Sequence, residues 1–294
     1  MFRYLRTFPH TFRPLIRRAG ILLAMLLPTF TATLAVAGGW DHVTHPSRTP
    51  PEVIGGPAAG CVSGAATLPS EGHGYQAMRL SRHRLYGHPS LIHFVRTLGE
   101  ALEARRLGVM LVGDLGQPRG GPTASLHRSH QNGLDVDIWY WLPEAAKERR
   151  LDQDEVETLS APSMLTKNRH ALDPTRWTPV QVEMLRLAAT HEEVDRIFVH
   201  PVIKKTLCDQ EQVQDWTHKV RPWWGHEDHM HVRLRCPPGD ELCVSQKPIP
   251  PGDGCGADLD WWLEAVAAAP TVVHPPHPPA PILPAACEAV LRAP

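Results

Sequence analysis

Three histidines fall within six residues in the last third of the chain, at His226, His229 and His231. Residues 229–235 alternate polar and apolar side chains, which is the period of a β-strand, so His229 and His231 share one face. Neutral imidazole is a common protein ligand for zinc, and two rings on one side of a strand allow one to bind metal while the other faces a substrate. The alternative is a surface histidine cluster with adventitious metal affinity.

A second segment, residues 127–139, places carboxylates beside two further histidines, His127 and His130. Asp135 and Asp137 alternate with apolar residues and therefore share one face of a second predicted strand, which begins just after the histidine loop. Such a strand can aim an Asp and a His at the same point. Taken alone, the segment is also compatible with a polar-faced surface strand whose histidines are incidental. Taken with the first segment, it favours a metal site.

The rest of the chain predicts an α+β fold that would position these segments. Apolar residues at helical spacing predict a helix over 91–106, and Thr178-Pro179 supplies the N-cap and first turn of a second helix. Further elements are expected at three places: a helix over 258–266 and short strands over 109–112 and 197–199. Because helices and strands do not alternate regularly, we expect a small antiparallel sheet that carries the metal ligands, flanked by helices and long loops.

The first 37 residues have the organisation of a secretory signal. Residues 1–18 contain five Arg and no acid, residues 19–32 are largely apolar, and Ala35-Val36-Ala37 is an A-x-A cleavage pattern. Removing this segment changes the formal charge of the 294-residue chain from -1 to -6, since it takes away five basic residues. An uncleaved anchor is the alternative, but the apolar run is short for a membrane span. We expect an exported, mildly acidic protein with no stable membrane insertion after cleavage and no generic nucleic-acid-binding surface.

Export makes disulfides the expected state of the six cysteines. Cys236 and Cys243 flank a Pro-Pro-Gly-Asp turn, so a bridge between them closes easily. Cys287 follows a stretch rich in proline, and its simplest partner is Cys61 near the mature N-terminus. These features divide the chain into three parts: a signal peptide over 1–37, a metal-binding domain over 38–266 and a proline-rich arm over 267–294 that is tethered by Cys287.

Together, the two histidine segments read H-x6-D from His130 to Asp137 and H-x-H from His229 to His231. These are the two signature motifs of the zinc peptidases of the lysostaphin, D-Ala-D-Ala peptidase and hedgehog fold group, which the chain resembles. It resembles most closely the penicillin-insensitive murein endopeptidase family, through longer strings: His127-Arg128-Ser129-His130-Gln131, Trp224-Gly225-His226, Gly113-Asp114 and Phe198-Val199-His200-Pro201. The likeness covers most of the chain between the signal segment and the proline-rich arm.

The resemblance implies a periplasmic enzyme that cleaves peptide cross-links of peptidoglycan, typically between D-Ala and meso-diaminopimelate. It implies that 38–266 is a zinc peptidase domain in which zinc is held by His130, Asp137 and His231. His229 is implied as the catalytic histidine, with His226 as a second candidate. The family also has metal-site candidates at the position of His127 and near His170. It further implies three disulfides: Cys61–Cys287, Cys208–Cys255 and Cys236–Cys243.

The chemistry of these residues agrees with that activity. Two neutral His and one Asp leave zinc with a net positive charge and an open position for water, whose pKa such a site lowers to about 7. His229 can move a proton between this water and the leaving amine, and Asp135 can orient a ligand imidazole from behind. Because no Ser or Cys acts as the nucleophile, a β-lactam has nothing to acylate.

Two other functions would use the same residues. A D-Ala-D-Ala carboxypeptidase would share every zinc ligand and differ in its treatment of a free terminal carboxylate. A non-catalytic, zinc-bearing cell-wall binding protein would be expected to lack the proton shuttle, whereas His229 and His226 are both present. The sequence therefore favours a zinc-dependent peptidoglycan endopeptidase.

Overall fold

The computed structural model describes residues 39–123, 128–210, 214–268 and 282–294. The predicted signal segment, His127 and most of the proline-rich stretch lie outside these ranges. Within the described residues, no helix is both long and apolar enough to span a bilayer.

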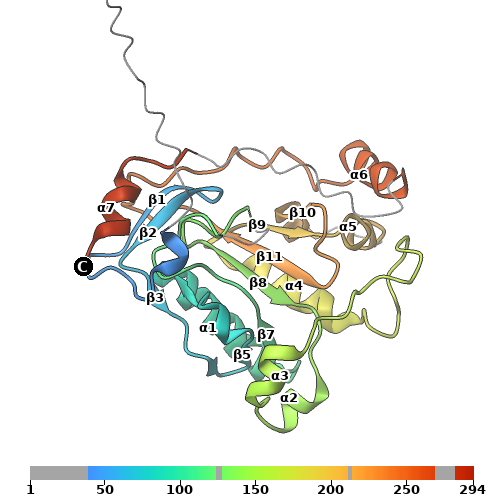
Figure 1. The fold of residues 1–294 in the computed structure, drawn as a ribbon. Helices are drawn as coiled ribbons and strands as arrows, with labels where there is room; N and C mark the ends of the chain where they lie inside the picture. Colours follow the sequence, from blue (N-terminus) through green and yellow to red (C-terminus); the bar gives the residue numbers. More distant parts are fainter. Residues whose placement is uncertain (1–38, 124–127, 211–213, 269–281) are drawn as a thin grey trace, which may run out of the picture. The chain divides into compact units, whose positions relative to one another are not determined.

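A seven-stranded mixed sheet forms the centre of the fold (Figure 1). Its strands follow the order β10 (Val220–Pro222), β9 (Val194–Val199), β11 (His229–Leu234), β8 (Asp135–Trp139), β7 (Met110–Val112), β5 (Tyr75–Ala77) and β4 (Glu71–Gly72). The pairs β9–β11, β11–β8 and β8–β7 are antiparallel, whereas β10–β9 and β5–β7 are parallel. The two strands predicted to carry the site are therefore neighbours in the antiparallel middle of the sheet.

Two helices, α1 (Pro89–Ala104) and α4 (Pro179–Thr190), cover one face of this sheet (Figure 1). Helix α1 begins two residues before the predicted position, with a proline in its first turn, and α4 begins with a reciprocal capping box between Thr178 and Gln181. Buried side chains of both helices and of the strands form one core, which includes Leu91, Phe94, Leu98, Met184, Leu185, Val136, Ile138, Met230 and Val232. This core fixes the apolar face of the sheet and leaves the polar face for the site.

Shorter elements surround the sheet and core. They are the hairpin β1 (Glu52–Gly56) and β2 (Ala59–Ser63), the strand pair β3 (Ala66–Thr67) and β6 (Tyr86–Gly87), the 3-10 turns η1 (Trp40–His42), η2 (Leu80–Arg82) and η3 (Asp215–Lys219), and the helices α2 (Glu144–Glu148), α3 (Gln153–Thr158), α5 (Pro201–Cys208), α6 (Ala257–Ala268) and α7 (Ala286–Arg292). The architecture confirms the predicted α+β class, with an antiparallel centre, flanking helices and long loops.

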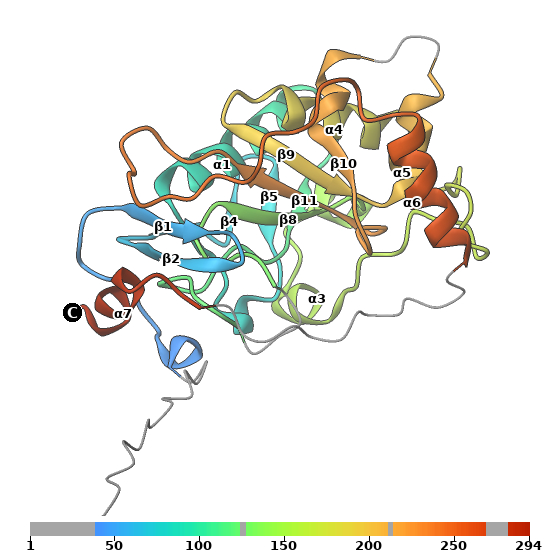
Figure 2. The same ribbon diagram turned by 90° about the horizontal axis from the view of Figure 1, so that it is seen from above.

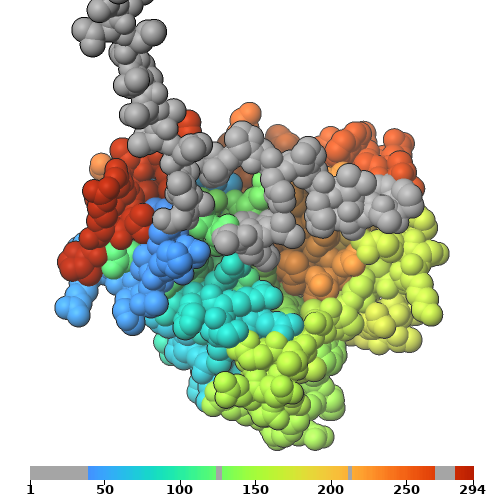
Figure 3. Space-filling model, viewed as in Figure 1, coloured from blue at the N-terminus to red at the C-terminus, as the bar shows by residue number. Residues whose placement is uncertain are grey.

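The carboxyl end of the chain is packed against the body and is not an extended arm. Helix α7 lies beside strand β2, as Figure 2 shows, and in Figure 3 its red atoms lie against blue atoms of the amino-terminal part of the domain. Cys287 of α7 is fully buried and bonded to Cys61. Arg119 donates hydrogen bonds of 2.6–3.0 Å to three carbonyl groups at the end of this helix, those of Val290, Leu291 and Ala293. The structure therefore differs from the predicted proline-rich arm at both of its ends. At the first end, α6 extends through Ala268, and at the other, the buried Cys61–Cys287 bridge holds helix α7.

Three disulfides are present, and they agree with the pairings that the sequence and the resemblance imply. Cys61–Cys287 joins β2 to α7, Cys208–Cys255 joins α5 to the segment before α6, and Cys236–Cys243 closes a short loop after β11. Their Cα–Cα distances are 5.7, 5.9 and 5.8 Å, which is the normal range for disulfides.

The bridge with the longest loop should contribute most to stability. Cys61 and Cys287 are 226 positions apart, whereas Cys236 and Cys243 are 7 apart. Loop-closure entropy then predicts that replacing both Cys61 and Cys287 by Ser lowers the free energy of unfolding by about 5 kcal/mol, against about 2 kcal/mol for the same change at Cys236 and Cys243. Urea unfolding of the two double variants measures the difference. Equal losses, or a larger loss for the short bridge, would contradict this expectation.

A buried histidine at the start of α5 should make the fold sensitive to acid. His200 is 2% exposed, and its Nδ1 accepts a hydrogen bond from the N–H of Val202 at 3.2 Å. Burial, assisted by the charge of Arg169, lowers the pKa of His200 to about 4. The unfolded chain titrates near 6.5, so it binds the proton more readily, and stability that is complete above pH 6.5 is lost as the pH falls toward 4.

The expected loss at pH 5 is at most about 2 kcal/mol relative to pH 7. His200→Asn keeps an N-cap acceptor but cannot be protonated, and it should reduce this pH dependence. Urea unfolding of both proteins at pH 7 and pH 5 tests the assignment. If the free energies of unfolding of the two proteins differ by the same amount at pH 7 and at pH 5, another group causes the acid sensitivity.

Candidate metal and catalytic site

The pairing of β8 with β11 brings two of the predicted ligands face to face. In the antiparallel register, His231 lies opposite Asp137 and Arg233 lies opposite Asp135. Side chains of directly opposed residues leave the sheet on the same side, with Cβ atoms about 5 Å apart. The polar face of this strand pair therefore presents both an imidazole and a carboxylate, while Met230 of β11 points into the core.

His130 reaches the same point from the loop that precedes β8. Its backbone is in the left-handed region, with φ 67°, which is uncommon for a residue with a side chain and costs about 1 kcal/mol or more. The N–H of His130 donates to Asp135 Oδ2 at 3.0 Å, which holds this conformation. Gly133, with φ 77°, completes the turn, and a Cβ there would lie 3.0 Å from the N atom of His88. Backbone strain at His130 thus serves to direct its ring.

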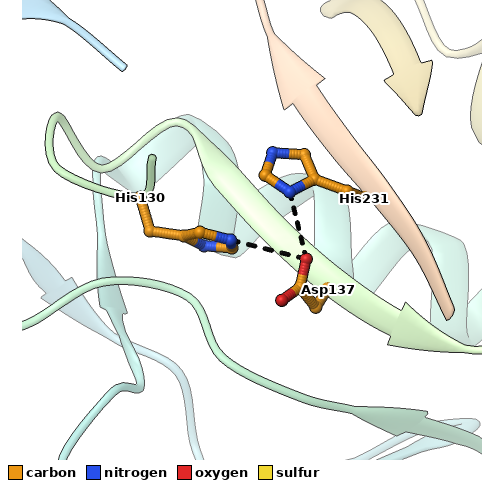
Figure 4. Close-up of side chains that lie close together, drawn as sticks. All are labelled: His130, Asp137 and His231. Carbon is orange, nitrogen blue, oxygen red and sulfur yellow. Dashed lines mark ion pairs between the residues drawn. The ribbon is translucent and has the colours of Figure 1, made fainter. Parts of the chain in front are cut away.

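The three side chains converge on one point, as Figure 4 shows. Asp137 Oδ1 lies 3.4 Å from His130 Nε2 and 3.2 Å from His231 Nδ1. All three residues are buried, and one ligand atom of each lies within 4.8 Å of the other two. Burial opposes ionisation of Asp137, but His130 and His229 beside it hold its pKa well below the usual range. Two imidazole nitrogens and one carboxylate oxygen are a donor set that suits zinc.

A second carboxylate orients His231 from behind. Asp135 Oδ1 lies 3.4 Å from His231 Nε2, on the opposite side of the ring from Asp137. Arg233 binds Asp135 through two hydrogen bonds, of 2.7 and 2.9 Å. Although burial works against the charge, Arg233 and His231 keep the pKa of Asp135 well below its usual value. The carboxylate therefore attracts the N–H of His231 to Nε2 and leaves the Nδ1 lone pair for a metal, as expected of an outer-shell acceptor.

His229 lies at the edge of this group, two residues along the same face of β11. Its Nδ1 is 2.6 Å from Asp228 Oδ1, and its Nε2 is 3.7 Å from Asp137 Oδ1. Burial lowers the basicity of the ring, but Asp137 and Asp228 outweigh it and raise the pKa of His229. A histidine that is held by one carboxylate and directs its other nitrogen toward the ligand group can accept or donate a proton there.

His226 lies on the turn before β11, and its ring centroid is 5.0 Å from that of His229 and 5.7 Å from that of His231. The turn consists of Gly225 and His226 in left-handed conformations, with φ of 69° and 58°. His226 Nδ1 lies 2.7 Å from the carbonyl oxygen of Trp224. Burial and the two neighbouring histidines lower the pKa of His226 well below its usual value, so this ring is neutral near pH 7.

The resemblance implied two further metal-site candidates, His127 and His170. His127 lies outside the described residues. His170 is exposed and does not belong to the cluster of His130, Asp137 and His231. Its neighbour Arg169 donates a hydrogen bond of 2.8 Å to Glu227, so the loop around His170 supports the turn of His226.

A cleft of about 220 Å³ opens beside the ligand group. Its lining residues include Arg79, Arg82, Asp114, Asp137, Trp139, Ser160, Asp228 and His229. Asp114 Oδ2 forms ion pairs with the guanidinium groups of Arg84, at 2.8 Å, and of Arg82, at 3.2 Å. Sequence reasoning did not assign Arg79, Arg82 or Asp228 to the site. The one available signal was the position of Asp228 next to His229, because an acid beside a candidate acid–base histidine can orient its ring.

Such a site defines a class of protein. A buried group of two histidines and one aspartate, next to a cleft and flanked by a histidine of raised pKa, is the arrangement of a metal-dependent hydrolase. A model of the family described as penicillin-insensitive murein endopeptidase matches residues 53–292. The chain belongs to this family. The match includes α7, and therefore extends beyond residue 266, where the sequence placed the end of the domain.

Relatives of known name agree over nearly the whole chain. A penicillin-insensitive murein endopeptidase of Yersinia enterocolitica is 42% identical over 277 residues, which cover 93% of this chain and 96% of that protein. Proteins of the same name from Yersinia pestis and Salmonella paratyphi C are each 41% identical. These alignments cover 92% and 90% of this chain, and 94% and 96% of the respective relatives.

Proposed function

We propose that this protein is a zinc-dependent endopeptidase that hydrolyses the D-Ala–meso-diaminopimelate cross-links of peptidoglycan in the periplasm. The observation that carries the proposal is the buried group of His130, Asp137 and His231 beside a cleft that also contains His229. Membership of the murein endopeptidase family supports the choice of peptidoglycan as the substrate. The disulfides and the signal-like residues 1–37 support an oxidising compartment outside the cytoplasm.

Each residue of the site has a role in such a hydrolysis. His130, Asp137 and His231 would hold the metal through the atoms that already face one another. Bound zinc would supply a Lewis acid and lower the pKa of a bound water to about 7. His229, held by Asp228, would carry a proton to the leaving amine, a role typically worth about 10²- to 10⁴-fold in rate. Asp135 would hold His231 in the tautomer that binds metal.

The same residues support insensitivity to penicillin. All six cysteines are in disulfides, so none is available as a nucleophile. Ser160 lines the cleft, but its hydroxyl lies 3.4 Å from the guanidinium of Arg79, which cannot act as a general base. A β-lactam inhibitor acts by acylating an activated nucleophile, and the proposed mechanism contains none.

Digestion of purified cross-linked muropeptides tests the proposal. The mature protein should convert each cross-linked dimer into two monomers by adding one water, as mass spectrometry would show, and benzylpenicillin should leave the rate unchanged. The His231→Ala variant serves as the inactive control. Loss of only a terminal D-Ala would instead identify a D-Ala-D-Ala carboxypeptidase, and binding without any product would identify a cell-wall binding protein.

A further inference from the structure

Four tryptophans form one exposed aromatic surface, which we call the tryptophan platform: Trp223, Trp224, Trp261 and Trp262. The first two lie between β10 and β11, and the other two lie on α6. Trp262 joins the two pairs, because its ring centroid is 5.6 Å from that of Trp223, 5.0 Å from that of Trp224 and 5.1 Å from that of Trp261. Trp223, Trp224 and Trp261 are 49%, 37% and 58% exposed. Contiguous exposed apolar surface of this kind marks binding sites in soluble proteins.

The platform is held in place by covalent and polar contacts. Helix α6 packs beside α5 (Figure 2), and the Cys208–Cys255 bridge joins α5 to the segment that leads into α6. Buried Lys204 of α5 donates hydrogen bonds to the carbonyl groups of Asp253 and Thr217, at 2.5 and 2.7 Å. The exposed indoles are therefore presented by a fixed support.

The platform is also continuous with the catalytic site. Trp223 packs against Phe198 at 5.6 Å, and Phe198 packs against the ring of His231 at 5.5 Å. On the other side of the turn, the carbonyl oxygen of Trp224 lies 2.7 Å from His226 Nδ1. A polymeric substrate that is bound at the metal group can therefore extend over the indoles.

We propose that the tryptophan platform binds the sugar strand of peptidoglycan, an inference that rests on the proposed function. The apolar C–H faces of pyranose rings pack on flat indoles through dispersion and burial, while indole N–H groups donate to sugar oxygens. The peptides of the same polymer carry carboxylates and suit this surface less. Helix α6 has three acids, Asp258, Asp260 and Glu264, and no basic residue, so it repels an acidic peptide and leaves an uncharged sugar unaffected.

The distances agree with this assignment. The ring-to-ring steps from His231 through Phe198 and Trp223 are 5.5, 5.6 and 5.6 Å, so Trp262 lies within about 17 Å of His231. In peptidoglycan, a stem of about four residues separates the cross-link from the sugar strand, and an extended chain of that length spans up to about 14 Å. A cross-link at the metal group therefore brings the attached sugars to the platform.

Trp261→Ala is the test variant, because among the described residues its ring contact is with Trp262 and its removal should leave the fold intact. Chitohexaose, an uncharged oligomer of the N-acetylglucosamine that alternates along the sugar strand, should change the tryptophan emission of the full-length mature protein. Binding should weaken about five- to tenfold in Trp261→Ala and be largely retained in Trp261→Phe. Val244→Ala, which shortens another exposed apolar side chain, is the matched control and should bind as the wild type does.

Cleavage supplies the second measurement. Trp261→Ala should lower kcat/KM for cross-linked strands that carry sugars and leave kcat/KM for a sugar-free cross-linked peptide unchanged. Glycan that leaves the emission unchanged, or a variant that loses both substrates equally, would overturn the platform's role. If the wild type cleaves neither substrate, the proposed function fails, whereas glycan binding by the platform is still decided by the fluorescence measurement.

Discussion

Replacement of His231 by alanine should empty the metal site and abolish hydrolysis. The change removes one of three ligand atoms that lie within 4.8 Å of one another, and it leaves the remaining two too few to retain the ion. Zinc measured by mass spectrometry should fall from about one ion per chain to a small fraction, and cleavage of cross-linked muropeptides should fall by about 10³-fold or more. A strong chelator should likewise remove zinc and activity from the wild type, and added zinc should restore the activity.

The matched control for this change is His170→Ala, which removes an exposed histidine outside the ligand group. It should retain both zinc and activity. Full activity in wild-type protein after verified removal of zinc would refute the metal-dependent mechanism. Loss of zinc in His170→Ala would instead show that a further ligand lies in the loop around that residue.

His229→Ala should separate proton transfer from metal binding. This ring is anchored by Asp228 at 2.6 Å and lies at the edge of the ligand group, so its removal should leave stoichiometric zinc in place. The rate of cleavage should nevertheless fall by about 10²- to 10⁴-fold, the usual contribution of a general acid–base residue. The measurements are kcat on cross-linked muropeptides and zinc content in the same preparation.

His226→Ala should resemble His229→Ala more than His231→Ala, because His226 is neutral and lies beside His229. Asp228→Asn should cause a smaller loss than His229→Ala, since it weakens the orientation of the ring without removing it. If zinc content falls equally in His229→Ala and His231→Ala, the division of roles along β11 is wrong.

The strands that carry the site could be predicted because alternation of polar and apolar residues is a local signal. Residues 135–139 and 229–234 show it clearly, and one side of each strand faces the core as expected. The partner of each residue could not be predicted, because the register that sets His231 opposite Asp137 depends on contacts between segments about a hundred positions apart. The left-handed backbone of His130 could not be predicted either, because the usual sequence signal for that conformation is a glycine and the residue here is a histidine.

The end of the chain was misjudged for a different reason. The segment between Pro284 and Pro294 is only nine residues long, too short for helical periodicity to stand out beside the many prolines before it. What fixes α7 is tertiary: the buried bridge to Cys61 and the hydrogen bonds that Arg119 donates to the last carbonyl groups. The bridge itself could be anticipated, but the helix that carries it could not.

The order of the disulfides along the chain has a consequence for biogenesis. The bridges are nested, with the first cysteine joined to the sixth, the second to the fifth and the third to the fourth. A chain that emerges amino end first presents Cys61 long before Cys287, and the next thiol to appear is the wrong partner, Cys208. Oxidation in order of emergence would therefore trap mispaired species, whose reshuffling takes seconds to hours. The Cys61–Cys287 bridge can form only when synthesis is almost complete, so the yield of this protein should depend on thiol–disulfide exchange.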